Sequence, residues 1–114
     1  MALIYKIVGA AEWRRSEAVG VFRGAAVDLD DGYIHFSAAD QVKETAAKWF
    51  AGRDDLILVA VEAEALGADL KWEPSRGGAL FPHLYAPLRL ADTAWSRPLP
   101  LGPDGRHEFG PLLS

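Results

Sequence analysis

One face of a short predicted strand carries three side chains that could do chemistry. Residues 33–37 read Tyr-Ile-His-Phe-Ser, and side chains alternate between the two faces of a strand. Tyr33, His35 and Ser37 therefore share one face, while Ile34 and Phe36 supply the core contact on the other. Imidazole acts as donor, acceptor or general base near neutral pH. This face is a candidate site; the alternative is a capped helix start beside a half-exposed sheet.

Residues 81–85, Phe-Pro-His-Leu-Tyr, repeat this arrangement of a histidine beside a tyrosine. In an extended segment, His83 and Tyr85 lie on one face. The two histidine segments together could line one pocket, with the tyrosine offering a flat face for stacking. The alternative is that His83 and Tyr85 tie an irregular sheet edge to the backbone.

Three charged residues are further candidates. Glu73 ends a predicted strand ahead of the Gly-rich loop at 74–78, where a carboxylate is either functional or solvated. Arg76, in that loop, could bind a phosphate or carboxylate through two parallel hydrogen bonds, or be solvated. Lys6 interrupts an apolar strand, so it needs a ligand, an acidic partner or a route to water.

A metal centre is a weaker hypothesis. His35, His83 and Glu73 would form a His-His-carboxylate set with open positions, as in catalytic zinc or non-haem iron sites. No His-x-His or HExxH spacing supports such a set. We therefore expect no metal, and we keep a metal-dependent enzyme as the third alternative.

Composition limits the class of protein. The chain has 114 residues, half of them hydrophobic and a quarter charged, which predicts one globular domain. The absence of cysteine excludes disulfides and thiolate chemistry. The net charge of −4 and the scattered Lys and Arg argue against duplex nucleic acid. No apolar run reaches the length of a membrane helix, and the opening residues resemble a strand rather than a signal peptide, so we expect a cytoplasmic protein. We also expect a monomer or weak homodimer that binds a small molecule or nucleotide.

The elements that must position these residues follow from periodicity and turn chemistry. We predict strands at 3–8, 33–36, 56–61, 70–73, 81–85, 88–90 and 94–99, a short helix at 10–19 and a helical turn at 62–67. Residues 28–32 and 74–78 are predicted loops, the second of them mobile. Strand 56–61 should be central and buried on both faces, whereas Pro82 and Pro87 favour edge or irregular positions. The result is an α+β domain over residues 1–114, with a split or partly open sheet, one or two packed helices and a turn-rich tail from residue 100.

The best-defined helix is predicted to start at Ser37. Its hydroxyl would cap the helix together with Asp40 in a capping-box-like pair, and Gly52 would end it. Val42, Ala46, Trp49 and Phe50 fall on one helical stripe and should face the core.

The residues quoted so far resemble a known family. Ile4 to Ile7, Trp13, residues 20–24, residues 31–37, Gln41, Trp72-Glu73 and residues 81–85 are similar to a bacterial family of small proteins, domain of unknown function nine-fifty-two. That family in turn resembles the ADP-ribosyltransferase fold, including RNA 2′-phosphotransferases. The resemblance implies a split sheet around a cleft that binds NAD.

Together with the residue patterns described above, the resemblance leads us to expect a set of site residues and a type of chemistry. His35, His83 and Glu73 would be catalytic, with Lys6, Tyr33, Ser37, Gln41, Arg76 and Tyr85 binding the ligand. Lys6 stands where many relatives have histidine, and the late catalytic glutamate has no clear counterpart. The expected function is binding of NAD or an ADP-ribose-like nucleotide with ADP-ribosyl- or phosphotransferase-related chemistry; the alternative is a non-catalytic module that binds a small metabolite.

Overall fold

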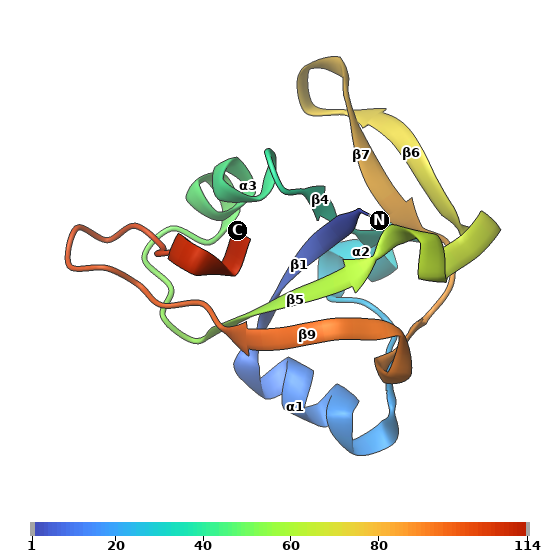
Figure 1. Cartoon of the computed structure of the whole chain (residues 1–114), viewed down its shortest axis with the longest axis horizontal. Helices are drawn as coiled ribbons and strands as arrows, with labels where there is room; N and C mark the ends of the chain where they lie inside the picture. The colour runs from blue at the N-terminus through green and yellow to red at the C-terminus, as the bar shows by residue number, and fades with distance from the viewer. Residues whose placement is uncertain (1, 114) are drawn as a thin grey trace.

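Antiparallel pairing joins the strands throughout the described part of the chain, which is residues 2–113 without the side chain of Arg76. The computed structural model has a radius of gyration of 13.3 Å, about the value for one compact domain of this length. Helices and antiparallel open sheets confirm the α+β prediction (Figure 1). The elements are β1 (Leu3–Gly9), α1 (Ala10–Val19), β2 (Val21–Phe22), α2 (Ala26–Asp31), β3 (Ile34–His35), β4 (Ser37–Ala38), α3 (Val42–Trp49), β5 (Leu56–Glu62), η1 (Ala63–Asp69), β6 (Leu70–Ser75), η2 (Arg76–Gly78), β7 (Ala79–Leu84), β8 (Leu88–Arg89), η3 (Leu90–Asp92), β9 (Thr93–Pro98) and η4 (Gly110–Leu113).

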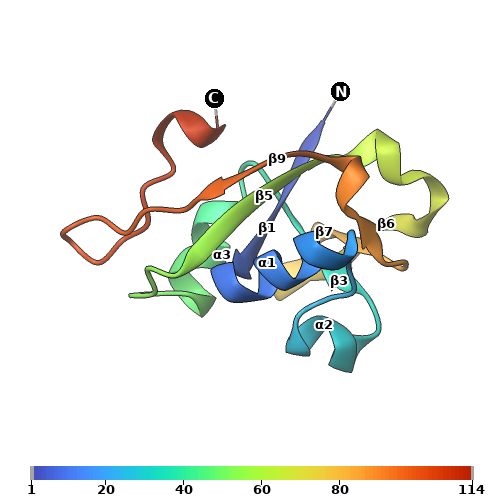
Figure 2. The same cartoon turned by 90° about the horizontal axis from the view of Figure 1, so that it is seen from below.

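The main sheet has the strand order β4-β1-β5-β9. Strand β5 lies between β1 and β9, and Leu58 and Val59, which point to opposite faces, are both fully buried. The prediction of a central strand at 56–61 is therefore confirmed. Helix α1 packs beneath this sheet (Figure 2) and ends at Gly20, whose φ of 84° suits a residue without a side chain.

A second sheet, β3-β7-β6, carries both histidine segments. In its register His35 lies directly opposite His83. Strand β7 is the middle strand, so the prediction that Pro82 occupies an edge was wrong. The carbonyl of Pro82 accepts from the N–H of Phe36, so its ring nitrogen also faces β3, where that pairing ends. The missing donor therefore costs no bond to β6.

Two apolar clusters form the core. The first holds Ile34 and Phe36 together with residues of β1, α1 and β5, as predicted for those two side chains. The second joins α3 to the other face of the main sheet and includes Phe109 from the tail, which is only 4% exposed. The tail from residue 100 therefore contributes to the core.

Four local predictions were wrong. Residues 26–31 form helix α2 where a turn was expected, and β6 and β7 continue to a tight turn, η2, where a loop over residues 74–78 was expected. Helix α3 begins at Val42, not at Ser37. Ser37 lies in β4 opposite Tyr5 and caps nothing, because strand pairing with β1 holds its backbone. Trp49, the last residue of α3, was expected to face the core but is 67% exposed and lines the pocket described below instead of joining the second cluster.

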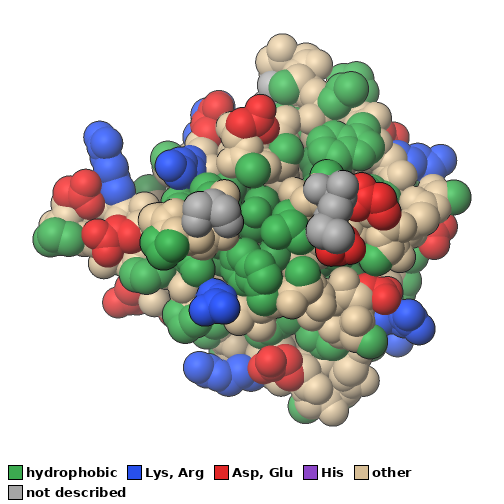
Figure 3. Space-filling model, in the orientation of Figure 1, with side chains coloured by type: hydrophobic (Ala, Val, Ile, Leu, Met, Phe, Trp, Pro, Cys, Tyr) green, Lys and Arg blue, Asp and Glu red, His purple; other side chains and the backbone are tan. Residues whose placement is uncertain are grey.

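Charged side chains are mixed rather than gathered on the face seen in Figure 3. Lys and Arg side chains alternate there with carboxylates around an apolar centre. No helix within residues 2–113 combines the length and apolar character needed to cross a membrane.

Candidate functional site

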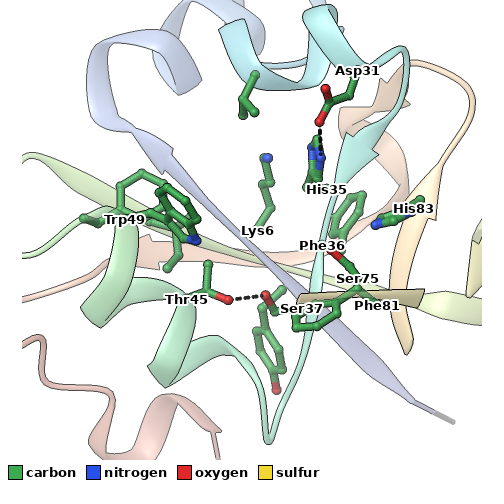
Figure 4. Close-up of a pocket in the computed structure, with 14 residues that line it drawn as sticks. Lys6, Asp31, His35, Phe36, Ser37, Thr45, Trp49, Ser75, Phe81 and His83 are labelled. Carbon is green, nitrogen blue, oxygen red and sulfur yellow. Dashed lines mark hydrogen bonds and ion pairs between the residues drawn. The ribbon is translucent and has the colours of Figure 1, made fainter. Parts of the chain in front are cut away.

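A pocket of about 480 Å³ lies between β1, β4, α3 and the sheet that holds the histidines. Pockets of this size hold small organic ligands. Figure 4 shows residues from all of these elements converging on it. Its polar lining consists of Lys6, Asp31, His35, Ser37, Thr45, Ser75 and His83, and its aromatic lining of Tyr5, Phe36, Trp49, Phe50 and Phe81, with Ile7 and Val27 completing it.

Asp28 is the buried centre of a charge network behind this pocket. Its side chain is 1% exposed, and its Oδ1 accepts hydrogen bonds from Nζ of Lys6 at 2.9 Å and from Nδ1 of His35 at 2.6 Å. The same Oδ1 accepts from the backbone N–H of His35 at 3.0 Å, and Oδ2 accepts from the N–H of Ala25 at 2.7 Å. Four N–H donors thus bond the two oxygens of this carboxylate, as expected for a charge that is buried in a protein.

Electrostatics keep Asp28 ionised. Burial by itself raises the pKa of Asp28, but the hydrogen bond from His35 and the charge of Lys6 outweigh it and lower the pKa to about 2. Burial lowers the pKa of Lys6, while the charges of Asp28 and Glu12 oppose that change. Of the alternatives considered for Lys6, the structure shows the acidic partner, which is Asp28. It does not show a route to water, because Lys6 is only 7% exposed.

Both ring nitrogens of His35 face carboxylates. Nδ1 bonds Asp28, and Nε2 lies 2.9 Å from Oδ2 of Asp31. Carboxylates only accept hydrogen bonds, so a doubly protonated imidazole is needed to donate to both. His35 therefore has no nitrogen left to act as a base, and its place in the pocket is that of a hydrogen-bonded wall.

Unlike His35, His83 has a carboxylate partner at only one of its two ring nitrogens. Its Nδ1 lies 2.8 Å from Oε1 of Glu73, and the hydroxyl of Tyr85 donates to the same oxygen at 2.6 Å. These hydrogen bonds, that from Tyr85 first, lower the pKa of Glu73, while Glu73 raises the pKa of Tyr85 to about 12. Because the carboxylate accepts from Nδ1, Nε2 of a neutral His83 carries the lone pair. Nε2 has no hydrogen-bond partner among the described residues, so it is available to a ligand.

Aromatic contacts fix the two histidines relative to each other. The ring of Tyr33 stacks on His83 with centroids 4.2 Å apart, and it lies 4.6 Å from the ring of His35. The two imidazole centroids are 5.5 Å apart. The two histidine segments therefore meet at one site, with Tyr33 and Tyr85 packed beside them 5.2 Å apart.

The remaining three predicted site residues have different positions. Ser37 lines the pocket, where its Oγ lies 2.9 Å from Oγ1 of Thr45. Gln41 lies outside the lining and bridges elements instead: its amide accepts from Ala38 and donates to the carbonyl of Leu80. Arg76 has its backbone in η2, and its side chain lies outside the described part of the chain.

The metal alternative has little geometric basis. Glu73 already engages Nδ1 of His83, and carboxylates engage both nitrogens of His35. Within residues 2–113, no group of three or more His, Asp or Glu side chains is arranged to hold a metal ion.

Sequence reasoning missed Asp28, Asp31 and the pocket residues of α3. The segment 28–32 was interpreted as a turn because three of its five residues are aspartate and one is glycine. Lys6 was the available signal, since an acidic partner is one of the three ways in which a lysine inside an apolar strand is accommodated. The sequence does not say which of its sixteen acidic residues supplies it.

Comparisons with known proteins identify close relatives. The family model described as "Protein of unknown function (DUF952)" matches residues 7–96. The crystal structure of protein CC0527 from Caulobacter crescentus is 57% identical and superposes with a TM-score of 0.93 over 97% of each chain. The solution NMR structure of CC0527 gives 57% identity and a TM-score of 0.88 over 96% of this chain and 95% of that one. No curated protein matches the chain.

Proposed function

Since the chain belongs to the DUF952 family of proteins of unknown function, we propose its activity from its own site: the pocket binds a small ring-bearing ligand, and His83 acts on it as a general base. The observation that carries this proposal is the Glu73–His83 pair. Glu73 holds Nδ1 of His83 at 2.8 Å, and Nε2 is left for the ligand at a pocket with an aromatic lining. A carboxylate that orients an imidazole in this way is a recurrent general-base arrangement.

The ligand class to test first is the nucleoside part of NAD or of an ADP-ribose-like nucleotide. A base or nicotinamide ring would stack on Trp49, which is 67% exposed, and a ribose hydroxyl would donate to Nε2 of His83. The only cation in the described lining besides the histidines is Lys6, and Asp28 already balances its charge. A pyrophosphate therefore gains little from this lining, and the nucleoside must supply the binding energy.

ADP-ribosyl transfer is the reaction that this arrangement would serve. The bond between C1′ and nicotinamide breaks through an oxocarbenium-like state, and the nicotinamide leaves with the bonding electrons. Nε2 of His83 would take the proton from the attacking hydroxyl, and Glu73 would stabilise the resulting imidazolium. Phosphotransferase-related chemistry would use the same base on the same kind of hydroxyl.

A non-catalytic metabolite-binding module is the second candidate. It is favoured by His35 and Lys6, whose polar atoms are engaged with Asp28 and Asp31 and so hold the pocket in shape. On this view His83 contributes one hydrogen bond, and no bond in the ligand is broken.

Thermal unfolding with adenosine, nicotinamide, ADP-ribose and NAD tests both candidates. A ligand at a hundred times its Kd adds about 2.7 kcal/mol, which raises the Tm of a domain of this size by about 10 °C. We expect adenosine or nicotinamide to give a shift that His83→Gln reduces and His107→Gln, outside this pocket, does not. No shift with any of the four would contradict nucleotide binding. A shift without turnover of NAD would favour the binding module.

A second test uses a tryptophan of the aromatic pocket lining, with a tryptophan outside the pocket as the control. Trp49 and Trp72 are both exposed, at 67% and 44%, but only Trp49 lines the pocket. Trp49→Ala should weaken binding by about 1 kcal/mol or more through lost stacking, whereas Trp72→Ala should leave affinity unchanged.

A further inference from the structure

Lys6 is a buried amine that the proposed function does not use. It lies on β1, is 7% exposed, and lines the pocket between Trp49 and His35 (Figure 4). An ammonium group has three N–H donors. Among the described residues, Nζ of Lys6 has one hydrogen-bond partner, Oδ1 of Asp28 at 2.9 Å. Its remaining donor positions are therefore available on the pocket side.

Asp28 does not depend on Lys6 for its hydrogen bonds. If Lys6 lost its proton, Oδ1 would keep both donors of His35, and Oδ2 would keep the N–H of Ala25. The neutral amine is thus tolerated here at a smaller cost than in an isolated buried ion pair, where the partner carboxylate would be left without donors. Burial also lowers the pKa of Lys6, the direction that makes an amine nucleophilic.

We propose that Lys6 is a nucleophilic lysine and that the pocket accepts a small uncharged aldehyde or ketone as a Schiff base on Nζ. The class of ligand follows from the lining, which offers aromatic rings and hydroxyls beside a charge-balanced Lys6–Asp28 pair. The inference rests on the proposed function only in that the pocket admits a small molecule, and it needs no step by His83.

The reaction balances with residues already present. The neutral amine attacks the carbonyl carbon, an N–C bond forms, and the oxygen takes the π electrons and a proton to give a carbinolamine. Loss of the hydroxyl group with a further proton as water leaves the imine. The two protons of this water are the two N–H protons of the neutral amine, so the step needs no proton donor besides Lys6.

The test is reductive labelling of the wild-type chain with limiting benzaldehyde and cyanoborohydride, which delivers hydride to the imine and makes the adduct permanent. The other lysines of the chain, Lys43, Lys48 and Lys71, are exposed and serve as internal controls in one peptide map. Each unit by which an amine pKa falls raises its neutral fraction at pH 7 about tenfold. Because burial lowers the pKa of Lys6 and so raises its neutral fraction, we expect the Lys6 adduct to form several-fold faster than the control adducts. Equal or slower labelling of Lys6 would overturn the proposal.

Two variants separate this inference from the proposed function. Lys6→Arg keeps the positive charge beside Asp28, cannot form a Schiff base, and should lose only the Lys6 adduct. His83→Gln removes the proposed base and should leave the rate of Lys6 labelling unchanged. Loss of nucleotide binding with intact Lys6 labelling would refute the proposed function alone; the reverse result would refute the lysine proposal alone. If His83→Gln abolishes labelling in a chain that still unfolds cooperatively, His83 is required and the proposal as stated is wrong.

Discussion

Asp28 accepts two hydrogen bonds from His35 on one oxygen, Oδ1: from the ring Nδ1 at 2.6 Å and from the backbone N–H at 3.0 Å. One buried carboxylate thereby joins helix α2 to strand β3. Through Lys6 the same oxygen also reaches β1. The position of the pocket wall therefore depends on the charge of a side chain that does not itself line the pocket.

Asp28→Asn should strongly destabilise the chain. The amide keeps the shape of the side chain but leaves Lys6, 7% exposed, without a counter-charge. Removing one partner of a buried ion pair costs about 3–5 kcal/mol. Urea unfolding measures the loss, with Asp30→Asn, exposed on the same helix, as the control. A loss no larger than that of the control would show that the network contributes nothing to stability.

Acid unfolding should carry a contribution from Asp28. Its pKa is about 2 in the folded state against the ordinary value of 3.8, so its carboxylate stabilises the fold above about pH 4. That contribution, of the order of 2 kcal/mol, is lost as the pH falls from about 4 toward 2. Free energies of unfolding measured across this range should fall more steeply for wild type than for Asp28→Asn. Parallel curves would mean that Asp28 has no depressed pKa.

Gly24→Ala should cost more than an alanine at an unhindered glycine. Gly24 has a φ of +121°, and an added Cβ would lie 2.8 Å from Cβ of Asp28. Gly52→Ala is the matched control, because Gly52 has a φ of +77° and nothing within 4 Å. Both variants suffer backbone strain, and Gly24→Ala adds a clash that should cost about 1 kcal/mol or more beyond it. If thermal unfolding gave the same loss of stability for both variants, the start of α2 would be able to move away from the added Cβ and relieve the clash.

Tyr85 should ionise late. The hydrogen bond to Glu73 and the charge of that carboxylate raise the pKa of Tyr85 to about 12. The phenolate absorbance of wild type minus that of Tyr85→Phe should therefore rise near pH 12. In Glu73→Gln the same difference should rise at lower pH, toward the ordinary value of 10.0. Far-UV circular dichroism at each pH confirms that the chain is still folded, and an unshifted curve in Glu73→Gln would contradict the contact.

Local patterns in the sequence predicted much of the fold. The apolar run 56–61 is a strand between two neighbours, and residues 10–19 form a helix that ends at Gly20. These elements follow from side-chain periodicity and from glycine chemistry, which act over a few residues. Helix α3 was predicted too early because the cap pattern at Ser37 is also local, and the pairing of Ser37 with Tyr5 on β1 overrode it.

The sequence by itself determined that His35 and His83 each stand beside a tyrosine on one face of an extended segment. Only the tertiary structure decided that the two segments pair, with His35 opposite His83, and that the histidines have different roles. Asp28 and Asp31 occupy both nitrogens of His35, while Glu73 occupies one nitrogen of His83. The reason is that a hydrogen bond depends on positions within about 3 Å, and residues 6, 28, 73 and 83 reach those positions only when the strands and helix α2 have packed.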